Sequence, residues 1–203
     1  MKNNFYTPLV LLFMLTGCAI NNVPPADIYT LSPKWNDTKV RTESKKNCPL
    51  ILKMAPVRAT QALIGNDIFY TDAQYVQNSY AYSRWNNAPV KLLPILFQVS
   101  IEESHLFEAI IPPTSISKSD LVLESTLLEL NHHIKNNGSS EGVIRIRFYL
   151  INNATRKIIA TKEFVSKVPA ATKNAKGAVE ALNKAATDIA HNLVIWLAKF
   201  DKF

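Results

Sequence analysis

The residue whose type and position most clearly predict a chemical reaction is Cys18, which directly follows Leu15-Thr16-Gly17. This is the lipobox pattern, in which diacylglycerol is joined to the thiol and the leader is cut off before the cysteine. The leader has one charge, Lys2, followed by an apolar run from Leu9 to Leu15, and that run is far shorter than the roughly 20 residues of a membrane span. We therefore predict a signal peptide at residues 1–17 and a lipid on Cys18.

A lipidated N-terminus fixes the compartment that we expect. Acyl chains buried in a bilayer hold a protein there firmly, and Ala19 takes the place where an aspartate usually keeps a lipoprotein at the inner membrane. The expected location is the outer membrane of a Gram-negative bacterium, with the domain on the periplasmic face. Loss of Lys2 with the leader lowers the formal net charge from +7 to +6. Export excludes nucleic acid as a partner, so this basic chain is expected to meet anionic headgroups or an acidic protein.

No other residues are spaced for catalysis or metal binding. His132 and His133 are adjacent, and consecutive side chains on a strand point to opposite faces, so we expect surface or partly buried imidazoles rather than metal ligands. Cys48 has no second cysteine to pair with once Cys18 is lipidated, and we expect a quiet, partly buried thiol, although pairing with another chain stays open. The few glycines form neither a dinucleotide fingerprint nor a P-loop. We predict no enzyme, no cofactor and no metal site.

One aromatic stretch stands out between the expected strands. It holds Phe69, Tyr70, Tyr75, Tyr80, Tyr82 and Trp85, with Asp72 and Arg84 among them. Aromatic and arginine side chains are enriched at the centres of protein interfaces, but cross-strand aromatic pairs in a hairpin use the same residues. Both interpretations stay open. The candidate surface for a partner or for self-assembly is Tyr75, Tyr80, Tyr82, Arg84 and Trp85.

The elements that position these residues begin after a polar N-terminal part. Residues 18–47 hold three prolines and a stretch, 36–47, with almost no apolar side chains, which predicts a lipidated N-terminus and tether. Within it, Ile28-Tyr29-Thr30-Leu31 is β-prone and could add a strand to the domain. We expect a single globular domain at residues 48–203.

Alternation and turn signals predict the strands of this domain. Strands are expected at 50–57, at 68–70 and 75–82 as one hairpin, at 121–134 with both faces buried for part of its length, and at 143–151 and 157–165 as the rest of a meander. A helix should run from Pro89 to about His105, with Pro94 tolerable only in its first turn. A long amphipathic helix should follow from Ala175 to Leu197. The expected fold is a three-layer α/β/α (α+β) domain with a mixed, largely antiparallel sheet.

Three segments together resemble a known family, the ABC-type transport auxiliary lipoproteins, which are similar to paraquat-inducible protein C. The segments are Ile28 to Leu31, then Val57 to Ala62 with Ile68-Phe69-Tyr70 and Asp72, and Tyr82-Ser83-Arg84-Trp85 with Pro89. The link Asn86-Asn87-Ala88 departs from the family pattern.

The resemblance implies a function without catalysis. Such lipoproteins accompany MCE-domain proteins and their ABC or membrane partners in moving phospholipid between the inner and outer membranes. On this view the tether provides reach and the folded domain docks a periplasmic partner. A second hypothesis is a lipoprotein that binds a lipid or small molecule, and a third, an envelope enzyme, has no constellation of residues to support it.

Overall fold

The computed structural model of the chain describes residues 24–32, 48–72 and 76–200. Eight strands and two α-helices make up these ranges. In chain order they are β1 (Asp27–Tyr29), β2 (Cys48–Ala59), the 3-10 turn η3 (Gln61–Leu63), β3 (Asp67–Thr71), β4 (Gln77–Trp85), α2 (Pro89–Glu103), β5 (Phe107–Ile111), β6 (Leu121–Ile134), β7 (Ser140–Asn152), β8 (Ile158–Pro169), α3 (Ala175–Leu197) and the 3-10 turn η4 (Ala198–Phe200). The strands and helices expected from the sequence are confirmed, with ends that differ by a few residues.

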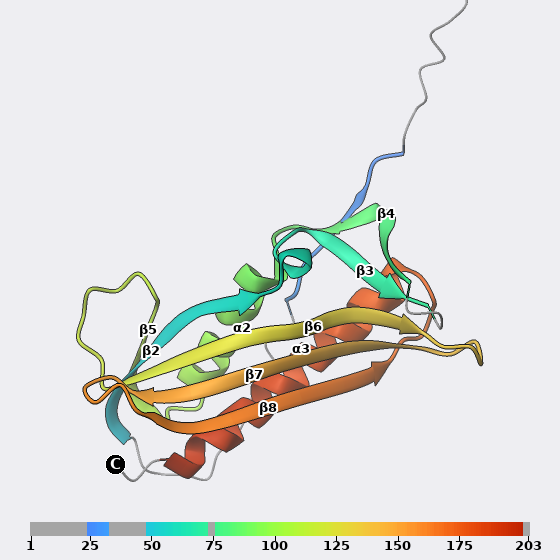
Figure 1. Ribbon diagram of the computed structural model, residues 1–203. Coiled ribbons are helices and arrows are strands. Elements are labelled where there is room, and N and C mark those ends of the chain that lie inside the picture. The colour runs from blue at the N-terminus through green and yellow to red at the C-terminus, as the bar shows by residue number, and fades with distance from the viewer. Residues whose placement is uncertain (1–23, 33–47, 73–75, 201–203) are drawn as a thin grey trace, which may run out of the picture.

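The eight strands form one mixed sheet that forks along β6. On one edge of β6 the antiparallel partners β7 and β8 complete a meander. On its other edge, β2 pairs in parallel with the first half of the strand and β3 pairs in parallel with its far end. Strand β5 lies beside β2, while β4 and then β1 lie beside β3 (Figure 1). The fork therefore creates two limbs that leave β6 at different points.

Side-chain alternation explains why the meander buries one face. In β7, Ile144, Ile146 and Phe148 point into the core. Arg145 and Arg147 point to the other face, where Glu163 of β8 lies 3.8 Å from Arg145 Nε and 2.6 Å from Arg147 Nη2. A face that carries such charged pairs stays in water, because covering it would remove several ions from solvent at once.

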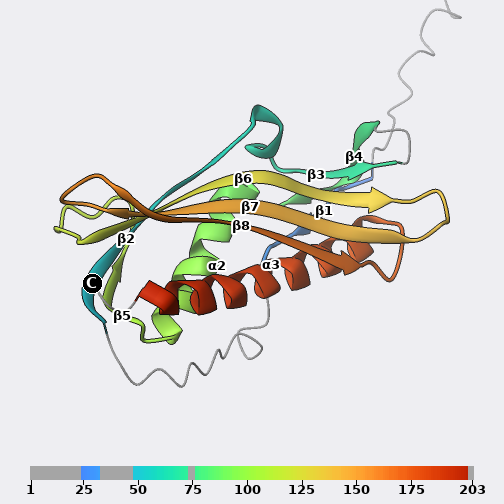
Figure 2. The same ribbon diagram turned by 60° about the horizontal axis from the view of Figure 1, so that its bottom comes forward.

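The two helices cover the same face of the sheet, as Figure 2 shows. A chain of aromatic rings joins the layers: Phe97 of α2 lies 5.4 Å from Phe148 of β7, Phe164 of β8 lies 6.0 Å from Phe148, and Trp196 of α3 lies 6.3 Å from Phe164, all between ring centroids. The mixed α+β fold and the long C-terminal helix are thus confirmed. The expected third layer is wrong, because both helices lie on the same face of the sheet.

Helix α2 begins with Pro89 at its first position, where a missing N–H costs nothing. Pro94 consequently lies beyond the first turn, contrary to the sequence-based expectation, and its ring leaves the Val90 carbonyl without its usual helical donor. Leu93, Phe97 and Ile101 of this helix are fully buried in the core. Their packing holds the helix together through the proline.

Helix α3 comes close to the sheet at Gly142 of β7. A Cβ built on Gly142 would lie 2.9 Å from Ala181 Cβ and 2.9 Å from the Leu182 backbone nitrogen. Only glycine lets the helix axis come this near. The helix is capped by Asn174, whose Oδ1 accepts a hydrogen bond of 3.0 Å from the Gly177 N–H.

The N-terminal segment is fastened to the fold from Asp27 to Ser32. Strand β1 pairs in parallel with β4, and the Asn86 N–H donates to the Tyr29 carbonyl at 2.6 Å. Leu31 is buried in the core. Asn183 of α3 holds the next backbone groups: its Oδ1 accepts from the Ser32 N–H at 2.9 Å, and its Nδ2 donates to the Thr30 carbonyl at 3.1 Å. The β-prone exception within residues 18–47 is therefore part of the domain.

Candidate functional site

Strands β1, β3 and β4 form the limb that carries the aromatic stretch, and we call this limb the arm. Two residue pairs join the arm to the rest of the sheet, Tyr70 with His132 and Thr71 with His133. The pairing of β3 with β4 shifts register between Asp67 and Phe69, so β4 carries extra residues there. The arm is thus a small three-stranded unit with a narrow connection to β6.

His132 lies at this connection and is fully buried, at 0% exposure. Its Nδ1 is 2.7 Å from the Tyr80 hydroxyl, and the ring centroids of Tyr80 and Tyr70 are 4.8 Å apart. Burial, reinforced by nearby His133, lowers the pKa of His132, and burial raises the pKa of Tyr80 to about 12. The imidazole is therefore neutral and shares a hydrogen bond with the Tyr80 hydroxyl. The expected surface or partly buried imidazole is wrong for His132, because the arm covers it.

His133 points to the opposite face, as strand alternation predicts, and its Nε2 lies 2.6 Å from Glu129 Oε1. Within the described ranges, no three His, Cys, Asp or Glu side chains gather closely enough to hold a metal ion. Cys48 is buried at the start of β2. Cys18 lies outside the described residues, so its lipidation stays a prediction.

The structure separates the predicted partner residues. Trp85 is 1% exposed and pairs with Tyr29 on the core side of the arm, so its assignment to a binding surface is wrong. Tyr80 turns inward to His132. Tyr82 is 51% exposed, and Arg84 is exposed with its Nη1 2.7 Å from Asp67 Oδ1. Tyr75 lies outside the described residues. The aromatic stretch therefore supplies both core and surface, and neither interpretation alone describes it.

Sequence reasoning missed one exposed neighbour of this surface. Ile28 is paired with Arg84 in the register of β1 and β4, and it is 64% exposed. The β propensity of this segment predicted a strand, but it did not predict which way the Ile28 side chain points. We call Ile28, Tyr82 and Arg84 the arm surface. A groove of about 380 Å³ borders it, lined by Asp27, Tyr29, Tyr80, Ala81, Tyr82, Ser83, Asn174, Ala175 and Lys176.

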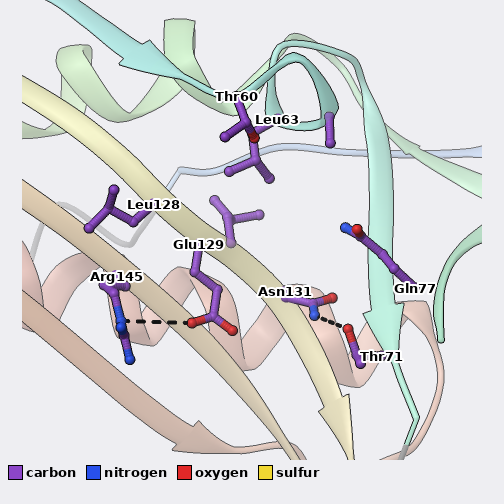
Figure 3. A pocket seen from close by; sticks show the side chains of 10 residues that line it. Thr60, Leu63, Thr71, Gln77, Leu128, Glu129, Asn131 and Arg145 are labelled. Carbon is purple, nitrogen blue, oxygen red and sulfur yellow. Dashed lines mark hydrogen bonds and ion pairs between the residues drawn. The ribbon is translucent and has the colours of Figure 1, made fainter. Parts of the chain in front are cut away.

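A second cavity lies where the sheet forks. Strand β2 last pairs with β6 at Ala59 and Leu127, and β3 first pairs at Tyr70 and His132. Between these points residues 128–131 of β6 have no partner strand on that edge among the described residues. We call the resulting cavity of about 520 Å³ the notch (Figure 3). Its lining is Thr60, Ala62, Leu63, Thr71, Gln77, Leu128, Glu129, Leu130, Asn131 and Arg145.

The walls of the notch carry both donors and acceptors. Asn131 is 8% exposed, its Nδ2 donates to Thr71 Oγ1, and its Oδ1 has no hydrogen-bond partner among the described residues. Glu129 Oε2 lies 4.0 Å from Arg145 Nε, and Gln77 projects into the space between the arm and β6 (Figure 3). No local sequence pattern could reveal this cavity, because it depends on where two strands distant in sequence leave a third.

The comparison with protein families identifies the class of this chain. A family model described as the ABC-type transport auxiliary lipoprotein component matches residues 29–194. The match spans most of the chain, so the chain belongs to this family, and the resemblance drawn from the sequence is confirmed. The matched range begins at the last residue of β1 and ends in α3, so it includes β3 and β4 of the arm, the notch and the meander.

Solved structures show the same fold. Protein XCC0632 from Xanthomonas campestris superposes with a TM-score of 0.75 at 17% identity, over 85% of this chain and 94% of that protein. An uncharacterized protein of known structure gives a TM-score of 0.65 at 14% identity, over 86% and 99% of the two chains. None of the curated proteins compared with this chain matches it. At these identities the structures establish the architecture alone. No helix in the described ranges has the length and apolarity that crossing a bilayer requires.

Proposed function

We propose that the protein is an outer-membrane lipoprotein that docks an MCE/ABC-type intermembrane phospholipid transport system and catalyses no reaction itself. The family match over residues 29–194 carries this proposal, because the family is an auxiliary lipoprotein component of ABC-type transport. Cys18 supplies the anchor, and Ala19 supports the outer membrane of a Gram-negative bacterium, periplasmic face.

The fastened N-terminal segment sets the distance between the anchor and the domain. Nine peptide steps separate Cys18 from Asp27 at the start of β1, and nine fully extended residues span at most roughly 32 Å. A tether running from Cys18 to Asn47 would reach much further. Because β1 is paired with β4 and Leu31 is buried, the fixed structure begins nine residues after Cys18. The maximum distance between the anchor and the arm is therefore roughly 32 Å, less than a free segment of residues 18–47 would allow.

The arm surface is the part of the domain that we propose contacts the MCE-domain partner. Tyr82 and Arg84 are side chains of the kinds that dominate binding energies at interfaces, and Ile28 adds an exposed apolar group beside Arg84. Its position on β1 and β4 puts it next to the segment that leads to the anchor. A partner that reaches across the periplasm to the outer membrane would meet this part of the domain.

Co-purification with the MCE-domain partner tests the arm surface. We expect the double variant Tyr82→Ala, Arg84→Ala to lose the complex while keeping the thermal midpoint of the parent protein, because both side chains are exposed. The matched control is Ile158→Ala, which removes a similarly exposed side chain from β8 at the other side of the sheet. Retention of the partner by the double variant, with its fold intact, would remove the arm surface from the account.

A lipid- or small-molecule-binding lipoprotein is the alternative, and the notch is the observation that favours it. Its volume of about 520 Å³ falls in the range of roughly 300–1,000 Å³ that ligand sites occupy. Its lining combines the polar side chains of Thr60, Gln77, Glu129 and Arg145 with apolar ones, so it could contact a headgroup as well as an apolar group. Mass spectrometry of organic extracts from the purified protein distinguishes the two functions. One bound lipid per chain would support a lipid-binding lipoprotein over a docking subunit.

A further inference from the structure

We propose that the notch is a binding site for an extended peptide segment of a second polypeptide, which pairs with β6 in the gap between β2 and β3. This inference goes beyond the proposed function, since it rests on the geometry of the notch and holds whether or not the arm surface docks a partner. The site would recognise main-chain amides first and one apolar side chain second.

The first argument is the unpaired edge of a central strand. On one side, β7 pairs with Glu129, Leu130 and Asn131, while Leu128 stands at a register shift of β6 against β7; no strand faces residues 128–131 on the other side among the described residues. Backbone groups of a regular strand alternate between its two edges, so at least one of residues 129–131 presents its N–H and C=O to the notch. Four residues cover roughly 13 Å along a strand, enough for a peptide of about four residues. An unpaired stretch of strand is a template for added β structure.

The second argument is Asn131, a buried amide that is satisfied on one side alone. Its Nδ2 bonds to Thr71 Oγ1, and its Oδ1 has no partner among the described residues. If the amide is turned over, the Thr71 hydroxyl donates to Oδ1 and the Nδ2 donors remain without an acceptor instead. A ligand that satisfies either orientation must offer both a donor and an acceptor. A peptide bond offers both.

The remaining lining suits a peptide as well. Gln77 and Thr60 place further donors and acceptors on the sides of the cavity (Figure 3). Leu63 and the partly exposed Leu128 provide apolar contact for one side chain of the ligand. Arg145 and Glu129 form an ion pair at the rim, so we expect the site to accept peptides of either charge.

The positions of Ser32 and Cys48, the described residues on either side of segment 33–47, favour a second polypeptide as the occupant of the notch. Ser32 is held by Asn183 of α3, on the helix-covered face. Cys48 begins β2 at the other end of the fold, where its N–H donates to the Leu106 carbonyl beside β5. Neither end lies at the notch, whose lining includes Arg145 on the charged face.

Peptide selection followed by backbone editing tests the proposal. The mature lipidated chain in detergent would be panned against a phage-displayed library of linear heptapeptides, and the enriched peptides would be made synthetically. We expect their dissociation constants to rise about tenfold or more in Leu128→Trp, which fills the notch from its rim, and to stay unchanged in Ile158→Trp. Replacing one peptide bond of the ligand by an ester, which removes a single N–H, should weaken binding by a similar factor at one or two positions.

Hydrogen exchange supplies the second readout and identifies the occupant. We expect the notch-facing amides within residues 128–131 to exchange faster than their neighbours in the protein alone and to become protected when the selected peptide is added. Affinities unchanged by both Leu128→Trp and the ester substitutions would overturn the proposal. So would full protection of these amides in the protein alone that disappears when residues 33–47 are replaced by a Gly-Ser segment of equal length, since the occupant would then be the chain itself.

Discussion

Asn183→Ala tests whether the N-terminal segment is fastened to the fold as tightly as the short anchor distance requires. The substitution removes the hydrogen bonds to the Ser32 N–H and the Thr30 carbonyl, together with the bond that Asn183 Nδ2 donates to the Val179 carbonyl within α3. Each such bond contributes about 0.5–1.5 kcal/mol, and the first two are exposed at the edge of the molecule, so we expect a loss of about 1–2 kcal/mol. If β1 and residues 30–32 are released, the steps between Cys18 and the first fixed strand rise from nine to thirty, and the maximum reach rises to roughly 105 Å.

The assay is amide hydrogen exchange at Asn86, measured by NMR. This N–H donates to the Tyr29 carbonyl and makes no contact with Asn183, so it reports the docking of β1 independently of the bonds that are removed. We expect its protection to fall about five- to thirtyfold in Asn183→Ala. Asn192→Ala on the exposed face of α3 is the matched control, because it makes the same change in helix propensity. Unchanged protection at Asn86 in Asn183→Ala would refute the reasoning that Asn183 holds the segment in place.

Two further predictions concern the packing of α3 against β7 and the burial of His132 where the arm meets β6. Gly142→Ala forces a methyl group against the backbone of α3 and should cost about 1–3 kcal/mol, seen as a lower urea midpoint, whereas Gly65→Ala, with nothing within 4 Å of the added Cβ, should change the midpoint little. Because burial lowers the pKa of His132, the unfolded chain takes up a proton near pH 6.5 while the folded imidazole stays neutral. Stability is therefore complete above pH 6.5 and falls as the pH drops below it, by up to about 1.4 kcal/mol per pH unit from this group. Urea midpoints at pH 7 and pH 5.5 should show a smaller drop in His132→Gln than in the parent and in the exposed control His191→Gln, and equal drops in all three would contradict the burial argument.

Local periodicity was sufficient to predict most elements of the fold, although β5 was not among the expected strands. The alternation of Ile144 and Ile146 with Arg145 and Arg147 identified β7 and its buried face, and the repeat from Ala175 to Leu197 identified α3 with its ends. These signals are local because each depends on the spacing of side chains along one element. The resemblance to the transport auxiliary lipoproteins joined several of them in order, and the family match confirms it.

The arrangement of the elements in space was harder to predict. The number of layers depends on which face of the sheet each helix covers, and that follows from Phe97 and Trp196 both reaching the same row of aromatic rings. The burial of Trp85 and His132 depends on the register between β1 and β4 and on the two pairs that join β3 to β6. The notch depends on the same long-range pairings. None of these long-range features produces a pattern within a short stretch of the sequence.

Metabolic labelling with radioactive palmitate tests the anchor on which the account depends. In Gram-negative cells that express the chain, we predict that label enters the wild-type protein, that the labelled protein sediments with the outer membrane, and that Cys18→Ser abolishes the label. A wild-type protein that keeps residues 1–17, takes up no palmitate and stays in the cytosol would contradict the account.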